Sequence, residues 1–353
     1  MSRFLQLHLL TFYPPSNLNR DDLGRPKTAR VGSAERLRLS SQALKRAWRT
    51  SDAFLARVGE HRGHRTQRLG EKIEEHLRGR GVAEDRARDI ARSIGEHFGK
   101  LKDAKDKNPT RTEQLVFIGP EEWTKALDVA ERLAAGEAIT PDATLLLRRT
   151  DTAADIAMFG RMLANKADFN REAAVQVAHA ITTHKATVED DYYTAIDDLK
   201  TLAEDAGAGF ISALGFGSGV FYLYLCVDLA LLRRNLAGDA DLAATACAAL
   251  VEAASTVAPR GKQPSFAARA RAHYVLAERG DVQPRTLAGA FLKPVHATES
   301  EDLAEQSRQA LEKWRQDLDG AYGQAAEGTC RMVVGKEGSL AEIVAFAEAA
   351  ARG

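Results

Sequence analysis

The sequence contains little cysteine. Only three of its 353 residues are cysteines, Cys226, Cys247 and Cys330, and no CxxC pair occurs. An odd number of widely spaced cysteines argues against a disulfide framework and against a cysteine-ligated zinc site. We therefore expect a protein of the reducing cytoplasm whose fold depends on a hydrophobic core.

Long apolar runs are also missing. The longest, Val220–Leu232, contains Asp228 and is too short to span a bilayer. The N-terminal residues have neither the long apolar core nor the small-residue cleavage site of a signal peptide. We expect no membrane association.

The formal net charge of the chain is zero, but its positively and negatively charged residues are unevenly distributed along the sequence. Up to Arg111 there are 25 Lys and Arg against 14 Asp and Glu, a net of +11, and the remainder carries a net of −11. A basic segment joined to an acidic one is typical of a nucleic-acid surface, or of complementary charge between subunits.

The apolar patterns predict an α+β or α/β fold with a helical insertion. Strands are expected at Phe4–Leu10 and Val220–Leu225, and charged helices over 65–107. Residues 17–39 show no apolar period and are predicted to form a long loop, whereas Glu172–Thr183 have a helical period.

A cluster of cations and hydroxyls follows the first strand. A helix is expected to open at Ser40, where free backbone N–H groups attract anions. The loop before the helix and one face of the helix carry Arg20, Lys27, Gln42, Lys45, Arg46 and Arg49. This combination suits a phosphodiester backbone, although a solvated helix face beside an ordinary loop would look the same.

A glycine-rich stretch, 215–219, precedes the strand at Val220. A dinucleotide-binding loop would follow a strand and open a helix, so this stretch is interpreted as a flexible hairpin tip. Phe216 lies within this stretch, and Phe210 precedes it. Aromatic residues in such a loop can wedge between bases, or can anchor a neighbouring subunit.

Catalytic and metal-binding patterns are weak. His179 and His184 are five residues apart, which is not the spacing of two helical metal ligands, and no hydrolase, phosphate-loop or zinc-protease motif occurs. Asp21 and Asp22 could serve metal-dependent nuclease chemistry, but the neighbouring cations could simply pair with them. We expect no metal and no cofactor.

Four segments resemble one known family. The first is LQLHLLTFYPPSNLNRDDLGRPKTARVGSAERLRLSSQALKRAWR, and the others are DIAMFGRMLAN, AVQVAHAITTHKATVEDDYYTAIDDL and GSGVFYLYLCVDLALL. Together they are similar to the backbone subunit of the type I-E CRISPR surveillance complex Cascade, the CasC family. The pairing of NRDD with SSQALKRA is the most specific part of the resemblance.

The resemblance implies a hand-like fold: a ferredoxin-like, RRM-type palm with an inserted helical fingers region and a thumb hairpin. The expected divisions are palm over 1–56, fingers over 57–138, palm over 139–184, thumb over 185–218 and palm again over 219–353.

The implied function is that of a non-catalytic backbone subunit in antiviral defence. Several copies would stack along the CRISPR RNA, bind its sugar-phosphate backbone, kink it at regular intervals and present the spacer to target DNA. The expected partners are other copies of the chain and the large, small, 5′-handle-binding and RNA-processing subunits. The alternative is a metal-dependent RNA endonuclease subunit that uses Asp21 and Asp22.

The resemblance also assigns roles to residues. The expected RNA contacts are Arg20, Lys27, Ser40, Gln42, Lys45, Arg46, Arg49 and Met162, with Met162 stacking on a base. Phe216 is the expected thumb aromatic, with Phe210 beside it. The target-DNA contacts are expected among the basic residues of the fingers, near Lys125 and Arg132 or in the arginine-rich stretch 57–111.

Overall fold

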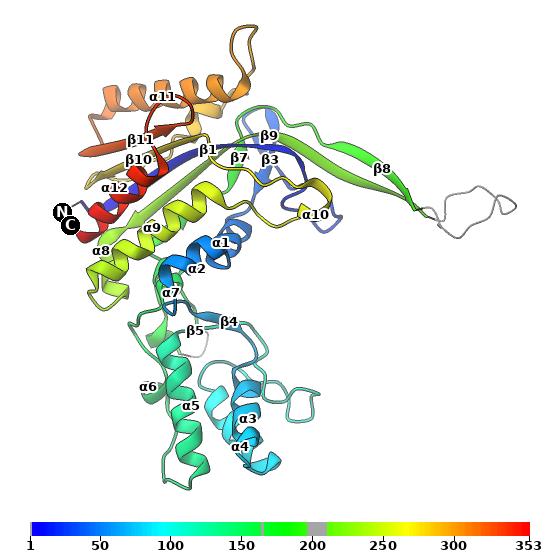
Figure 1. Cartoon of the computed structure of the whole chain (residues 1–353), viewed down its shortest axis with the longest axis vertical. Helices are drawn as coiled ribbons and strands as arrows, with labels where there is room; N and C mark the ends of the chain where they lie inside the picture. The colour runs from blue at the N-terminus through cyan, green and yellow to red at the C-terminus, as the bar shows by residue number, and fades with distance from the viewer. Residues whose placement is uncertain (1, 164–165, 196–209) are drawn as a thin grey trace, which may run out of the picture.

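A computed structural model describes residues 2–163, 166–195 and 210–353. A single large antiparallel sheet forms the body, a helical module hangs from one side of it, and a long hairpin projects from its edge (Figure 1). The expected α+β class with a helical insertion is confirmed.

The sheet has the strand order β11-β10-β1-β9-β7-β3-β2, and β6 and β8 also pair with β9. Every strand pair in it is antiparallel, and β1 is central, with Leu7 opposite both Leu225 and Ala277. The strands are β1 (Phe4–Ser16), β2 (Thr28–Val31), β3 (Ala34–Leu39), β6 (Val175–Val177), β7 (Ala180–Thr182), β8 (Glu189–Ala195), β9 (Phe210–Asp228), β10 (Tyr274–Gly280) and β11 (Gly328–Val333).

Helices cover both faces of the sheet, which explains why β1 is buried at every position from Leu5 to Thr11, the polar Gln6 and His8 included. Leu5, Leu7 and Leu9 pack on one helical layer, while Leu10 faces the opposite layer. The first layer contains α1 (Ser41–Arg49), α2 (Asp52–Val58), α7 (Ala154–Phe159), α8 (Leu229–Asn235), α9 (Ala240–Thr256) and α12 (Leu340–Arg352). The second contains α11 (Leu303–Tyr322) and the short 3-10 helix η2 (Ala288–Phe291).

The helical module has its own hydrophobic core. Leu69, Ile73 and Leu77 line one helix face of that core, as their spacing predicts. The module contains β4 (His64–Thr66), α3 (Leu69–Gly79), α4 (Glu84–Gly95), β5 (Val116–Ile118), α5 (Pro120–Ala134), α6 (Ala143–Leu146) and the 3-10 helix η1 (Ala167–Phe169). Its core extends beyond residue 138, because Leu146 and Phe169 pack in it.

Two buried ion pairs lie at the junction of module and body. Arg161 donates to Glu122 at 2.5 Å, and Arg171 lies 3.5 Å from Asp151, with all four side chains at most 2% exposed. Both arginines also donate to the carbonyl of Arg148. Arg171 also donates to the Asn235 carbonyl at the end of α8, at 3.0 Å, so the buried pairs connect the module to a helix of the body, and breaking such a pair would leave an uncompensated charge.

Two sequence-based assignments of local structure are wrong. Residues 28–39 form the β2–β3 hairpin instead of a loop, and Glu172–Thr183 contribute β6 and β7 instead of a helix. In the second case the β-branched Val175 and Ile181 pair with Val227 and Tyr222 of β9. The open edge of that long strand supplies the hydrogen bonds that a helix would have made internally.

The glycine-rich stretch 215–219 is also not a hairpin tip. It lies within β9, where the hairpin leaves the sheet, and Gly215 and Gly217 pair with Asp190 and Ser16. The described part of the hairpin, β8 paired with β9, forms an arm that extends well beyond the body (Figure 1). A side chain at Gly217 would meet Leu37 at 2.8 Å, so the glycine permits the close crossing at the base of this arm.

Candidate nucleic-acid interface

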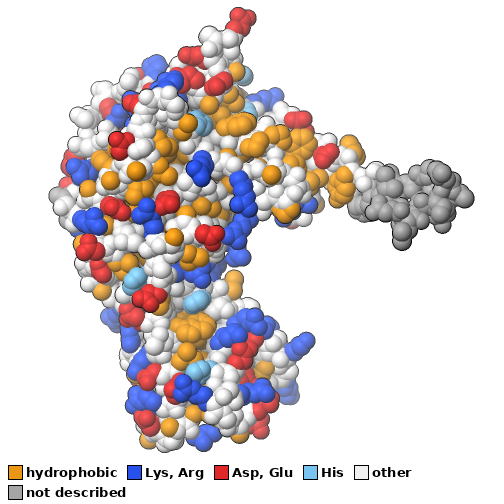
Figure 2. Space-filling model, viewed as in Figure 1, with side chains coloured by type: hydrophobic (Ala, Val, Ile, Leu, Met, Phe, Trp, Pro, Cys, Tyr) orange, Lys and Arg blue, Asp and Glu red, His pale blue; other side chains and the backbone are white. Residues whose placement is uncertain are grey.

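A concave surface lies between the arm, the body and the helical module. Lys and Arg side chains gather along its inner edge, beneath the arm and beside α1 (Figure 2). The loop before β2 and the helix α1, which carry most of the candidate RNA contacts, belong to this part of the body (Figure 1).

The loop at 17–27 is anchored at both ends. The Asn17 amide donates to the carbonyls of Gly24 and Gly215, at 2.9 and 2.8 Å, and so ties the loop to the base of the arm. Oδ1 of Asn19 accepts from the Ser40 N–H at 2.8 Å, and the Lys27 N–H donates to the Asn19 carbonyl at 2.8 Å. The loop therefore presents Arg20 and Lys27 beside the start of α1.

The helix α1 begins as the sequence predicts. The Ser40 hydroxyl accepts from the Ala43 N–H at 3.3 Å, and the first turn contains no acidic residue. Gln42 and Arg46 are exposed, and neither side chain has a hydrogen-bond or ionic partner among the residues that the structure describes. Ser40 is itself nearly buried and acts mainly as the cap of the helix.

Lys45, on the same helix, has a half-buried side chain. Its Nζ lies 5.8 Å from the centre of the Phe159 ring, which is within reach of a cation–π interaction. Partial burial lowers the pKa of Lys45. An anion that reached this ammonium would therefore meet a partly desolvated charge, which strengthens its electrostatic interaction with the lysine.

Arg49, an expected RNA contact, already has several partners within the chain. Its guanidinium donates to Asp155 and to the Gly63 carbonyl, and it lies 4.6 Å from the centre of the Phe117 ring. The side chain is only 12% exposed. Helical spacing places Arg49 on the basic face, but tertiary contacts direct its guanidinium group to Asp155, and its contact with RNA stays a prediction.

Met162 is presented to solvent. It is 82% exposed, although its neighbours Arg161 and Leu163 are both buried. The backbone here is held by a pair of hydrogen bonds between Arg161 and Arg171, and the Leu163 N–H donates to Asn170 at 2.6 Å. A thioether held outward in this way is available to stack on an apolar or aromatic surface such as a base.

The two candidate arm aromatics, Phe216 and Phe210, both belong to β9. Phe216 is half-buried at the base of the arm, and its ring centre lies 5.9 Å from that of Phe266. Phe210 begins the described part of β9, and the placement of its side chain lies outside what the structure describes.

One of the two carboxylates in the loop at 17–27 serves local structure. Oδ1 of Asp21 accepts from the Leu23 and Arg25 N–H groups at 3.0 and 2.9 Å, which fixes the turn, while Asp22 is exposed. Among the residues that the structure describes, no three His, Cys, Asp or Glu side chains converge on a possible metal position.

Sequence reasoning missed one basic pair at this interface. Nη1 of Arg38, on β3, lies 2.9 Å from Nδ1 of His179, which follows β6. Burial and the charges of Arg38 and Lys27 lower the pKa of His179. The incorrect assignment of both segments hid this contact, since only strand pairing brings β3 next to residue 179.

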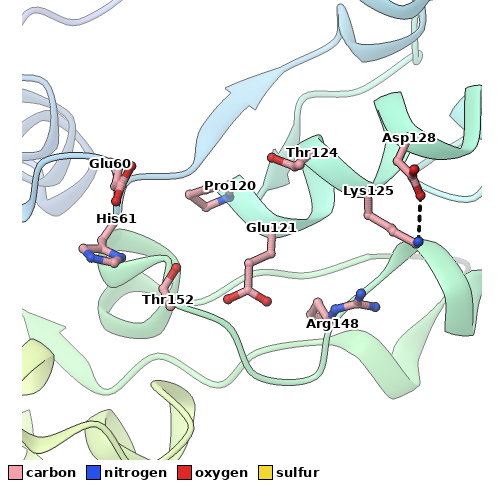
Figure 3. Close-up of a pocket in the computed structure, with 9 residues that line it drawn as sticks. All are labelled: Glu60, His61, Pro120, Glu121, Thr124, Lys125, Asp128, Arg148 and Thr152. Atoms are coloured by element: carbon pink, nitrogen blue, oxygen red, sulfur yellow. Dashed lines mark hydrogen bonds and ion pairs between the residues drawn. The ribbon is translucent and has the colours of Figure 1, made fainter. Parts of the chain in front are cut away.

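The basic residues expected to contact target DNA are partly engaged. Lys125 donates to Asp128 at 2.8 Å, and Arg132 donates to Glu137 at 2.8 Å. Lys125 also lines an open pocket of about 580 Å³ where the module meets the body (Figure 3). Both acidic and basic side chains line this pocket, which is formed by Glu60, His61, Pro120, Glu121, Thr124, Lys125, Asp128, Arg148 and Thr152.

Comparison with known proteins gives a consistent result. The model of the CT1975-like protein family matches residues 5–350. A solved chain described as "CRISPR RNA-guided surveillance complex, pre-nicking" is 31% identical, with a TM-score of 0.85 and coverage of 99% of this chain and 100% of that one. A second, described as "CRISPR RNA-guided surveillance complex", is 27% identical, with a TM-score of 0.76 and coverage of 98% and 100%. No curated protein sequence matches.

In the described part of the chain, none of the helices combines the length and the apolar character needed to cross a bilayer.

Proposed function

Because the chain belongs to the CT1975-like protein family, we propose that it is a non-catalytic backbone subunit of a type I-E CRISPR Cascade complex. In this role several copies bind along a CRISPR RNA, hold its sugar-phosphate backbone and leave the spacer accessible to target DNA in antiviral defence. We propose that the complex acts in the cytoplasm, where it would meet both the guide RNA and the target DNA.

One observation carries the proposal: the basic surface beside α1 lies in a chain whose whole length aligns with a chain of an RNA-guided surveillance complex. The exposed Arg20, Gln42 and Arg46 and the half-buried Lys27 and Lys45 offer cationic and polar contacts to phosphates. Such contacts are independent of sequence, which suits a subunit that must accept any spacer.

Two further features support the proposal that the protein kinks the guide RNA. The arm reaches beyond its own body, so it can contact a neighbouring copy and the RNA between the copies (Figure 1). Met162 is exposed and can stack against a base at a kink. We propose that the arm and Met162 together interrupt the stacking of the guide at regular intervals.

The absence of catalysis is part of the proposal. The carboxylate of Asp21 is already an acceptor for two N–H groups of its own turn, which favours a structural role over metal binding. Incubation of the assembled complex with paired RNA and Mg²⁺ is expected to leave the RNA intact. Cleavage that disappears in a D21A/D22A variant would instead establish the endonuclease alternative.

The main test is co-expression with a CRISPR RNA and the other complex subunits, followed by gel filtration with absorbance read at 260 and 280 nm. We expect a large species rich in nucleic acid that yields one discrete RNA. A K45A/R46A variant is expected to lose RNA, whereas an R234A/R352A control, which removes the same charge from exposed positions on α8 and α12, is expected to retain it. A nucleic-acid-free species from the unmodified chain would contradict the proposal.

A further inference from the structure

A second basic surface lies in the otherwise acidic part of the chain. Residues 256–271, which we call the arginine loop, contain four cations and no carboxylate: Arg260, Lys262, Arg269 and Arg271. The chain after Arg111 has a net charge of −11, so this concentration of positive charge is a local exception. None of these cations belongs to the set expected to contact RNA.

The arginine loop has a defined shape. A hydrogen bond from the Ala272 N–H to the Ser255 carbonyl, at 2.8 Å, closes its base. Inside it, the Gln263 amide donates to the carbonyls of Pro259 and Ala268, at 3.1 and 3.2 Å. Compact loops that are closed and internally bonded in this way are frequently functional.

Backbone strain is concentrated at the same place. The short helix α10 (Gln263–Phe266) is flanked by Lys262 at φ 51° and Ala267 at φ 49°. A non-glycine residue in the left-handed region costs free energy and persists only where the surroundings hold it. Two such residues in one loop therefore indicate that the conformation itself is maintained.

A pocket of about 760 Å³ opens between the arginine loop and the start of α2. Arg260, Arg269 and Arg271 line it, and Asp52 is the one carboxylate on its wall among the described residues. Nη2 of Arg260 donates to the Thr50 carbonyl at 3.0 Å. Arg269 and Arg271 are exposed and have no carboxylate partner in the described part of the chain, so their guanidinium groups are available to an anion.

The arginine loop touches three parts of the candidate interface. Arg260 reaches the C-terminal end of α1, and the Phe266 ring packs on Phe216 at the base of the arm. Gly261 lies so close to the loop at 17–27 that an added Cβ would be 2.2 Å from the Leu18 carbonyl oxygen. The pocket therefore lies next to the C-terminal end of α1, the helix that presents Lys45 and Arg46.

We propose that the arginine loop binds the phosphodiester backbone of a single-stranded nucleic acid, as a second contact site beyond the α1 face. The planar guanidinium group can hold two phosphate oxygens at once, and unpaired arginines around an open pocket suit an extended polyanion. The inference rests on the proposed function, and it adds a site contributed by residues from the C-terminal third of the chain.

The test is a titration of the purified full chain with labelled single-stranded RNA and with DNA of the same sequence, over a series of salt concentrations. Each phosphate contact that is lost should flatten the plot of log affinity against log salt by about 0.7. For R269A/R271A we expect a slope less negative by about 1.4 and an affinity lower by about tenfold or more near 0.1 M salt. An R269K/R271K variant keeps the charge and should keep most of the slope.

Three comparisons make the outcome decisive. R234A/R352A removes two charges elsewhere and should leave both binding curves unchanged. A loss confined to RNA identifies the guide as the ligand of the loop, and a loss confined to DNA identifies the target strand. Unchanged slope and affinity for both ligands in R269A/R271A, alongside weaker RNA binding by K45A/R46A, would overturn this inference and leave the proposed function standing. Unchanged binding in both variants would overturn the two together.

Discussion

The Arg49 guanidinium donates two hydrogen bonds to Oδ2 of Asp155, from Nε at 3.1 Å and from Nη2 at 2.9 Å. Asp155 is fully buried and also accepts from the Gly63 N–H at 2.7 Å. The pair therefore joins α1, the segment leading into the helical module, and α7. A residue that belongs to the basic face by sequence spacing instead connects the body to the module.

Replacement of Arg49 should destabilise the fold more than it changes the chemistry of RNA contact. R49A leaves the buried Asp155 without its cation, and we expect a loss of about 3 kcal/mol in the free energy of unfolding. R46A, one turn away and exposed, should change stability by less than about 0.5 kcal/mol. Urea unfolding of both variants tests this, and equal stability of the two would refute the structural role of Arg49.

Replacement of Met162 should weaken RNA binding without changing the stability of the fold. Because the side chain is 82% exposed, M162A is expected to leave the unfolding free energy unchanged. Loss of a thioether contact with a base should weaken RNA binding by about two- to tenfold. RNA with a fluorescent base analogue at successive positions would report the stacking directly. Identical fluorescence for M162A and the unmodified protein at every position would exclude the base contact.

Phe216 and Phe266 should be energetically coupled. Their ring centres are 5.9 Å apart, so a double-mutant cycle of F216A and F266A is expected to give a coupling of about 0.5–1.5 kcal/mol. If Phe216 also acts as the arm aromatic that shapes the RNA, F216A should shorten assemblies on a long guide more than F266A does. Equal shortening would assign Phe216 to anchoring of the arm alone.

Glu71 should make part of the stability dependent on pH. Hydrogen bonds from Arg68 and Arg111 lower the pKa of Glu71 to about 2, from a usual value of 4.5. A carboxyl group whose pKa is lower in the folded chain stabilises the fold above its unfolded pKa, and this contribution is lost as the pH falls toward the folded pKa.

The variant E71Q isolates this contribution. It should unfold at lower urea than the unmodified chain at pH 7, and the difference should shrink between about pH 5 and pH 2. E75Q, at an exposed position on the same helix, should leave the urea midpoint at pH 7 nearly unchanged. A difference that stayed constant from pH 7 to pH 3 would show that the charge of Glu71 does not contribute.

Local patterns in the sequence were sufficient to predict several helices and strands and to identify the family. The Ser40 cap, the apolar stripe at Leu69, Ile73 and Leu77, and the strand at Val220–Leu225 depend on neighbours within a few residues, and each is confirmed. The resemblance to a subunit of a CRISPR surveillance complex is also confirmed, since it rests on residue identity along the chain.

Tertiary structure alone decided where charges point and which segments pair. Residues 175–177 and 180–182 become strands because the long edge of β9 offers backbone partners, and Arg49 turns inward because Asp155 is buried more than a hundred positions away in the sequence. The arginine loop lies against the end of α1 and against the loop at 17–27 through contacts between residues that are far apart in the sequence. Periodicity describes only the near neighbours of a residue, whereas desolvation and pairing depend on atoms that folding brings together.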